Sequence, residues 1–156
     1  MCSTNFFTPF SWCYWASVGT ALICGGLIGI ERQLLGKPAG LRICIIIVLA
    51  TDIFVSLSQE LTTETGDPSR VIASVASGVG FLGGGVILAR HGRIQGVTTA
   101  ATIWILAAIG AIIGLGKFFA AIASTLILIV VAIFIDVLEV RGIITKKEIA
   151  PEDDQL

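Results

Sequence analysis

The sequence predicts an all-α polytopic membrane protein, a compact bundle of five transmembrane helices with its N-terminus outside and its C-terminus in the cytoplasm. Three observations support this fold class. Hydrophobic residues make up 55% of the 156 residues and charged residues 13%, with a mean hydropathy of +0.96. Five apolar stretches approach the roughly 20 residues that a spanning helix needs. Basic residues also gather in alternate connections between these stretches.

The composition excludes several classes of protein. A soluble domain carries about twice this fraction of charged residues, so a soluble fold of this length could not cover its apolar surface. The 10 basic and 11 acidic side chains nearly balance, which argues against a nucleic-acid-binding surface. We therefore expect the lipid bilayer as the main partner and no nucleic acid.

The predicted helices cover residues 11–30, 41–57, 71–89, 97–115 and 118–138. Together they form one transmembrane domain over residues 1–140, followed by a short cytoplasmic tail (141–156) that we expect to be mobile. The run 43–49 is apolar throughout, unlike the alternating pattern of a barrel strand. No basic residue precedes the first stretch and it reaches spanning length, so we interpret it as a retained anchor rather than a signal peptide.

The predicted orientation follows from the basic residues. Eight of the ten Lys and Arg residues lie in the connection between helices one and two, the connection between helices three and four, and the tail. Only Arg70 and Lys117 lie on the other side. Because basic residues favour the cytoplasmic side, this distribution puts the tail inside. Aromatic residues at the outer ends of the first and fifth helices, such as Trp12, Trp15 and Phe118, agree with an interfacial belt.

Glycine pairs four residues apart predict helix faces that approach one another closely, because small residues allow tight packing in lipid. The pairs are Gly25 and Gly29, Gly80 and Gly84, and Gly110 and Gly114. One such face could receive a partner or a second copy of the chain. The run 83–85 either packs in the same way or allows a kink. The G-x-G-x-x-G pattern at 78–83 lies inside an apolar span, so it does not indicate nucleotide binding.

Asp52 is the unusual polar residue of the spans. It lies about ten residues from Arg42, roughly 15 Å along a helix, which places it near the bilayer centre. An intramembrane carboxylate is costly and normally faces the bundle interior. Two interpretations follow: an ion or proton site, or a protonated carboxyl bonded to Thr51 or to a neighbouring helix.

A second polar group is predicted where the first helix ends. Glu31 and Arg32 end that helix and Arg42 begins the next. These charges either form a local ion pair that helps to set topology, or face Thr98 and Thr99, where the start of the fourth helix favours an anionic group such as Glu31.

No catalytic constellation is recognisable in the sequence. We find no Ser/His/Asp or Cys/His set with credible geometry, so we expect neither enzyme activity nor a cofactor. The four cysteines lack the close pairs of a zinc site, and we assign no metal. We interpret them as small apolar side chains.

Several segments, in this order and spacing, resemble the MgtC/SapB membrane family over about residues 20 to 115. They are Gly29-Ile30-Glu31-Arg32, the segments 36–42 and 67–70, the glycine-rich run 78–87, and the segment 96–104. The family's motif positions fall on Glu31, Arg32, Arg42, Asp67, Arg70, Thr98, Thr99 and Trp104.

The resemblance implies a bacterial inner-membrane protein with a five-helix hydrophobic domain. Members are associated with growth under magnesium limitation and with survival inside host cells, and are thought to restrain the F-type ATP synthase. Many carry a soluble C-terminal domain, which we do not expect in this sequence. The sequence also departs from the family at Thr51 and Asp52, where small apolar residues are expected.

Two functions are therefore predicted. The first is a non-enzymatic regulator of membrane energetics and ion homeostasis that contacts the F-type ATP synthase or another membrane complex through a glycine-lined helix face. The alternative is a small carrier or channel for magnesium or protons, built around Asp52 and acting alone or as a homo-oligomer.

Overall fold

The computed structural model describes residues 11–61, 68–90 and 93–140 and contains five long helices. They are α1 (Trp12–Leu34), α2 (Leu41–Leu61), α3 (Pro68–Val86), α4 (Val97–Gly114) and α5 (Phe118–Val140). All five are long and apolar enough to cross a membrane. The predicted five-helix membrane protein is therefore confirmed, whereas its orientation stays a prediction. The predicted mobile tail and Asp67 lie outside the described residues.

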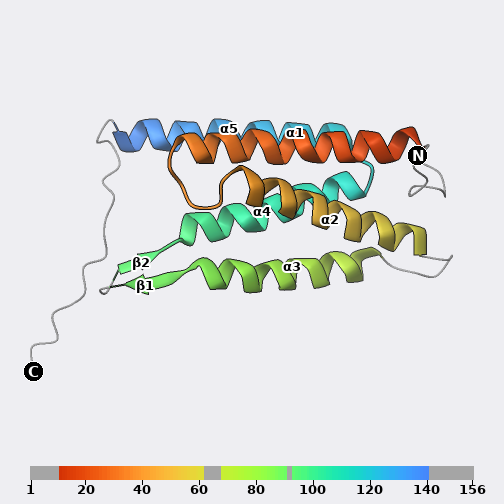
Figure 1. Cartoon of the computed structure of the whole chain (residues 1–156), viewed down its shortest axis with the longest axis horizontal. Coiled ribbons are helices and arrows are strands. Elements are labelled where there is room, and N and C mark those ends of the chain that lie inside the picture. The colour runs from red at the N-terminus through yellow and green to blue at the C-terminus, as the bar shows by residue number, and fades with distance from the viewer. Residues whose placement is uncertain (1–10, 62–67, 91–92, 141–156) are drawn as a thin grey trace, which may run out of the picture.

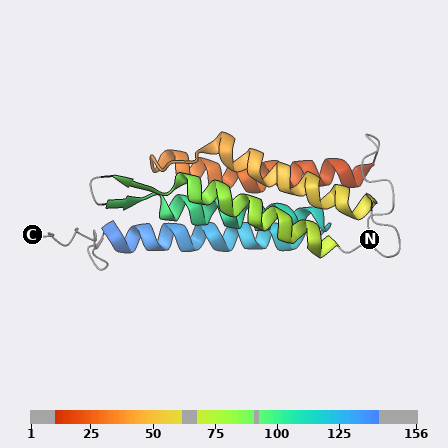
Figure 2. The ribbon, with the colours of Figure 1, turned by 90° about the horizontal axis from the view of Figure 1, so that it is seen from below.

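The helices run side by side along one long axis (Figures 1 and 2). In Figure 1, α1 and α5 form one layer, α2 and α4 the next, and α3 the last. Half of the α4 span is buried inside the bundle, whereas only 11% of the α3 and α5 spans is buried. Helix α4 is therefore the central element, and α3 and α5 present most of their surface to lipid.

A short hairpin joins α3 to α4 within the otherwise all-α fold. Strands β1 (Leu88–Arg90) and β2 (Arg93–Gln95) pair antiparallel, with Leu88 opposite Gln95. The prediction of a helix to residue 89 is wrong, because α3 ends at Val86, just after three consecutive glycines that weaken a helix. Gly96 then turns the chain into α4 with φ 90°, and a Cβ atom there would collide with the Val86 carbonyl.

The other helix ends differ from the predicted ones by a few residues. Helix α1 begins at Trp12, with Ser11 as its N-cap, and continues through Glu31 and Arg32 to Leu34. Helix α3 begins at Pro68, because proline is well suited to the first helical turn. Apolar patterning detects the part of a helix inside the hydrocarbon, so it misses turns that continue into the polar interface.

The bundle buries polar side chains together with apolar ones, and it exposes many large apolar side chains. Its core includes Ala21, Cys24, Cys44 and Leu106, each at most 1% exposed. Large exposed side chains cover the outside, among them Ile46, Phe54, Phe81, Ile127 and Phe134. Such an exterior suits lipid, since apolar burial does not drive helices together there.

The structure corrects the interpretation of one cysteine. Cys13 is disulfide-bonded, whereas Cys24 and Cys44 are free and buried. Isolated positions in apolar sequence gave no sign of this bond.

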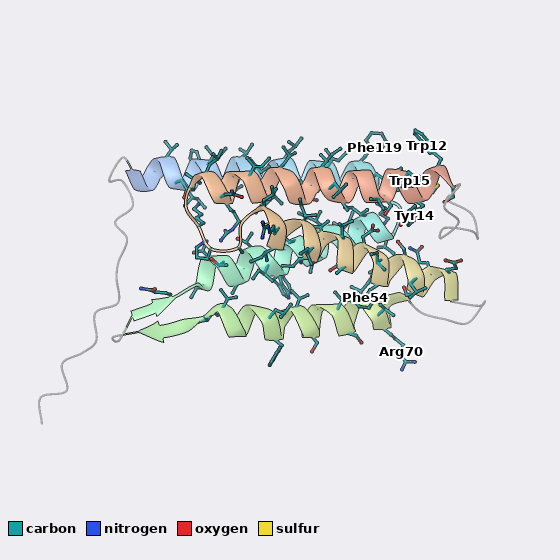
Figure 3. All side chains as sticks on the ribbon, viewed as in Figure 1. Trp12, Tyr14, Trp15, Phe54, Arg70 and Phe119 are labelled. Atoms are coloured by element: carbon teal, nitrogen blue, oxygen red, sulfur yellow. The ribbon has the colours of Figure 1, made fainter. Side chains whose placement is uncertain are left out.

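We call the two ends of the bundle the hairpin end and the aromatic end. The hairpin end carries the connection 35–40, the β1–β2 hairpin and the last turn of α5. The aromatic end carries Trp12, Trp15 and Phe119, and Arg70 lies there too (Figure 3).

Candidate functional site

Arg32 is buried at the hairpin end and joins three parts of the chain. It is 3% exposed. Its Nε donates to the carbonyls of Pro38 (3.1 Å) and Ala39 (3.2 Å), and Nη2 donates to Pro38 as well (2.5 Å). Nη2 and Nη1 also donate to the hydroxyls of Thr99 and Thr102, each at 2.9 Å. The guanidinium thus ties α1 to the connection 35–40 and to the first turns of α4.

The backbone conformation of the connection 35–40 directs two of its carbonyl groups toward Arg32. The backbone is left-handed at Gly36 (φ 63°) and at Ala39 (φ 61°), and Lys37 N donates to the Arg32 carbonyl over 2.9 Å. Left-handed geometry is unusual for alanine and needs support from its surroundings. Ala39 is buried, and the two hydrogen bonds that its carbonyl accepts, from Arg32 and from the Cys44 thiol, provide that support.

Glu31, beside Arg32, faces a different partner. Lys37 Nζ lies 3.6 Å from Glu31 Oε1 and 2.6 Å from Asp136 Oδ2. The ammonium thus bridges α1 and α5 across the hairpin end. Among the described residues, Glu31 Oε1 is buried and accepts no hydrogen bond, because its contact with Lys37 is an ion pair longer than a hydrogen bond.

These groups line a cavity of about 260 Å³ between α1, α4 and α5, which we call the hairpin-end cavity. Its polar part consists of Glu31, Arg32, Lys37, Thr98, Thr102 and Asp136. Its apolar part comes mainly from α5 and consists of Leu128, Ile129, Val131, Ala132 and Ile135, with Ile28, Ala101 and Ile105 from α1 and α4. One part of the cavity is therefore lined by charged and polar groups, and the other part is lined by apolar side chains.

Asp52 forms a second polar centre, halfway along α2. It is 2% exposed, and its Oδ2 accepts from the Ser17 hydroxyl of α1 (2.5 Å). Ser56, one turn later on α2, donates to Oδ1 (3.2 Å) and also contacts the Gly114 carbonyl of α4 (3.5 Å). Gln59 donates to the same carbonyl. The predicted interior position and interhelical bonding agree with the structure, but the neighbour is Ser17 rather than Thr51.

Two glycine pairs bring backbones into direct contact. A Cβ atom at Gly25 would lie 2.8 Å from Ile45 Cα, and one at Gly29 2.6 Å from Leu41 Cα. On α4, a Cβ atom at Gly110 would lie 2.5 Å from the Val48 carbonyl oxygen. One at Gly114 would lie 2.7 Å from Val55 Cβ. Helix α2 therefore packs closely against α1 on one side and α4 on the other.

The third pair is open. A Cβ atom at Gly80 or Gly84 of α3 would have nothing within 4 Å. Only Gly83 of the triple-glycine run meets α4, where its Cβ atom would lie 3.5 Å from Ala100 Cβ. Helix α3 continues through this run and ends at Val86, one residue after it.

The structure brings together only part of the predicted polar cluster, namely Glu31, Arg32, Thr98 and Thr99. Arg32 contacts Thr99, Thr98 lines the hairpin-end cavity, and Glu31 pairs with Lys37. Arg42 is exposed and belongs to neither group. Glu31 and Thr98 both line the hairpin-end cavity, but the hydrogen bond to Thr99 comes from Arg32 and not from Glu31.

The remaining motif residues lie elsewhere. Arg70 is exposed at the aromatic end, where it points away from the bundle (Figure 3). Trp104, 58% exposed, lines a groove between α3 and α4.

Sequence reasoning missed four contributors, namely Lys37, Asp136, Ser17 and Ser56. Lys37 and Asp136 are 99 residues apart, so no local spacing signals their contact. The pattern Asp52 to Ser56 is a one-turn helical spacing and could have signalled that pair. In the described part of the chain, no group of three or more His, Cys, Asp or Glu residues gathers that could hold a metal ion.

Comparison with known proteins identifies the family. The sequence model of the MgtC family matches residues 18–141. The chain belongs to the MgtC family. It is 41% identical over 109 residues to protein MgtC of Salmonella typhimurium, covering 70% of this chain and 46% of that protein. It is 43% identical over 122 residues to the "Putative magnesium transporter YhiD" of Escherichia coli K12, covering 73% of this chain and 57% of that protein.

An uncharacterized protein of Haemophilus influenzae is 37% identical over 139 residues, which cover 81% of this chain and 57% of that protein. The chain thus spans about half the length of the curated relatives it matches. No solved structure matches it. The match covers α2 to α5 and all of α1 except its first turns. Apart from Ser17, the residues of both polar centres therefore lie inside the matched residues 18–141.

Proposed function

We propose that this MgtC-family protein is a non-enzymatic regulator of membrane energetics and ion homeostasis in the bacterial inner membrane. It docks on another membrane complex, and the resemblance names the F-type ATP synthase as that complex. The name of the Escherichia coli relative, "Putative magnesium transporter YhiD", supports a link to magnesium. A contribution to virulence belongs to the same proposal, as does the orientation with the hairpin end in the cytoplasm.

One observation carries the proposal: the open glycine pair of α3. A groove with a volume of about 410 Å³ runs between α3 and α4. It is lined by Val79, Gly80, Gly83, Gly84, Ile87, Val97, Ala100, Ala101 and Trp104. Its floor is made of small residues, and Trp104 stands at its side.

The occupant we propose is a transmembrane helix of the partner complex. Where this chain packs glycine pairs internally, the backbone of another helix lies directly against them, as at Gly25 and Gly110. Small residues allow such approach in lipid, where packing and not apolar burial drives association. The α3 pair has the same spacing, and no helix of this chain covers it.

The test is co-purification from mildly solubilised membranes, read out as the membrane subunits of the F-type ATP synthase. We expect Gly80→Leu combined with Gly84→Leu to abolish co-purification, because two leucines fill the groove. Gly78→Leu is the matched control, since Gly78 is also open but does not line the groove. ATP-driven proton pumping in inverted vesicles should be restrained by the wild type and by Gly78→Leu but not by the double variant. Full co-purification by the double variant would contradict the proposal.

The alternative, an ion carrier, is favoured by one observation: a carboxylate buried in mid-span. Asp52→Asn in purified protein reconstituted into liposomes separates the two functions. A carrier loses its flux of magnesium or protons, whereas a regulator keeps its partner in the co-purification experiment. The hydrogen bonds that both Asp52 oxygens accept within the bundle support a structural role instead.

A further inference from the structure

The hairpin-end cavity contains a buried acceptor that the chain itself does not satisfy. Glu31 Oε1 is buried, and among the described residues no donor lies within hydrogen-bond distance of it. Lys37 is the nearest cation, but its ammonium is drawn 1.0 Å closer to Asp136, at 2.6 Å against 3.6 Å. A buried acceptor without a donor is destabilising, so a ligand that brings an N–H group to Glu31 would be favoured.

The charges of the cavity indicate a ligand with both signs. Two carboxylates, Glu31 and Asp136, face two cations, Arg32 and Lys37. Every acceptor described for Arg32 is an uncharged carbonyl or hydroxyl, so its positive charge has no carboxylate partner. The Lys37 ammonium has three N–H donors, of which the described contacts use at most two. The cavity can therefore take an ammonium at Glu31 and an anion near Lys37.

The depth of the cavity matches a lipid headgroup. Glu31 lies 19 residues along α1 from Trp12, and Asp136 lies 18 residues along α5 from Phe118, which correspond to about 27–29 Å of helix. This is close to the roughly 30 Å thickness of the hydrocarbon core. Because Trp12 and Phe119 mark the other interface (Figure 3), the carboxylates lie at headgroup level.

The apolar wall of the cavity leads toward the hydrocarbon. The α5 side chains Val131 and Ile135, 47% and 49% exposed, lie both on the lipid-facing surface and in the cavity lining. Leu128 and Ile129 continue the same wall toward the middle of α5. An acyl chain attached to a headgroup in the cavity can follow this wall without leaving the bilayer.

We propose that the hairpin-end cavity binds an aminophospholipid. Its ammonium donates to Glu31, its phosphate accepts from Lys37, and one acyl chain lies against α5. This cavity shares only Ala101 with the groove between α3 and α4, and its charged groups are not part of that groove, so the proposal does not depend on the proposed docking function. It also does not depend on which end of the bundle faces the cytoplasm, because each leaflet presents headgroups at this depth.

The test is native mass spectrometry of the full chain released from nanodiscs containing equal amounts of phosphatidylethanolamine, phosphatidylcholine and phosphatidylglycerol. We expect the wild type to retain one phosphatidylethanolamine about tenfold more often than phosphatidylcholine, whose methylated nitrogen has no N–H donor, a factor typical of a charge-assisted hydrogen bond. Glu31→Gln should reduce this preference to about onefold. Glu60→Gln, a matched change on an exposed residue of α2, should preserve it.

A second pair of variants tests the acyl wall. Ala132→Trp fills the cavity and should reduce lipid retention about tenfold, whereas Ala123→Trp, on the exposed face of α5, should not. Equal retention of the two lipids by the wild type, or an unchanged preference in Glu31→Gln, would overturn the proposal. Binding of soluble phosphoethanolamine without retention of the lipid would overturn the assignment of an acyl chain to the site.

Discussion

Helices α1, α2 and α4 form a tightly packed unit, whereas α3 lies beside them with little of its surface buried. In the first region, Gly25, Gly29, Gly110 and Gly114 each lie against the backbone or Cβ atom of a neighbouring helix. In the second region, Gly80 and Gly84 have nothing within 4 Å. Glycine pairs with the same four-residue spacing thus let helices pack closely in the first region and leave an open surface in the second.

Polar groups follow the same division. Among the described residues, the two buried ones of the Asp, Glu, Lys and Arg types are Arg32 and Asp52, and both join helices of the tightly packed unit. Buried polar groups need partners that hold their positions, and a rigid unit supplies them. A mobile or replaceable contact is more easily made on α3, where no buried polar bond has to break. We infer that the unit holds the fold and that α3 is the surface free for partners.

The largest effect is expected where glycine meets backbone. In Gly110→Ala, the new methyl group would lie 2.5 Å from the Val48 carbonyl oxygen, so α2 and α4 must separate. We expect the free energy of unfolding to fall by about 3 kcal/mol, as for severe overpacking. The measurement is unfolding in detergent by titration with sodium dodecyl sulfate.

Gly80→Ala is the control for this comparison. Its methyl group meets open space and alanine favours the helix, so stability should stay constant or rise by up to about 1 kcal/mol. Equal stability of the two variants would show that the α2–α4 contact yields easily, and the distinction between the regions would fail.

The next largest effect is expected at Arg32. Arg32→Lys keeps the charge, but an ammonium cannot reproduce the planar set of donors that reaches two carbonyls and two hydroxyls. We expect a loss of about 2 kcal/mol in the free energy of unfolding. Arg42→Lys, on an exposed residue of α2, should change it by less than about 0.5 kcal/mol. Similar losses in both variants would refute the role of Arg32 as the link between α1 and α4.

The contrast between the regions also shows what could be predicted from the sequence. Apolar length and basic flanks predict each span, because the bilayer fixes how long and how apolar a helix must be. The depth of Asp52 follows from the same arithmetic. Its partner Ser17 does not, since that contact depends on how α1 rotates against α2. Glycine spacing predicts close packing, but which pair meets a helix of the same chain is decided by the whole assembly.

Local chemistry accounts for the other differences. The hairpin 88–95 is too short to produce a period-two pattern, and the apolar residues before it extend the pattern of α3. At the hairpin end, Glu31 and Arg32 are adjacent, so sequence alone does not tell which one turns toward α4. Arg32 takes that position because the carbonyls of 38 and 39 lie on the same side as Thr99 and Thr102.

A smaller effect is expected at Asp52. Asp52→Asn keeps the size of the side chain but replaces one acceptor oxygen by a donor group, so one of the bonds to Ser17 and Ser56 is weakened. We expect a loss of about 1 kcal/mol. A double-mutant cycle with Ser17→Ala should give a coupling energy of about 1 kcal/mol, whereas a cycle with Thr102→Ala, in the Arg32 network, should be additive. Additivity with Ser17→Ala would contradict the α1–α2 bond.

The smallest effect on stability is expected at Gly84 of α3, and the neighbouring Gly83 provides the sharpest contrast with it. Gly84→Leu meets open space, so the free energy of unfolding should change by less than about 1 kcal/mol, the size of the helix-propensity term. Gly83→Leu points its side chain at Ala100 of α4 and should cost about 1–3 kcal/mol, as overpacking does. If α3 can move away from α4, the two variants should have equal free energies of unfolding. A difference between these adjacent positions would show that α3 has a fixed face toward α4 and a separate face, one residue further along, that is free to receive another helix.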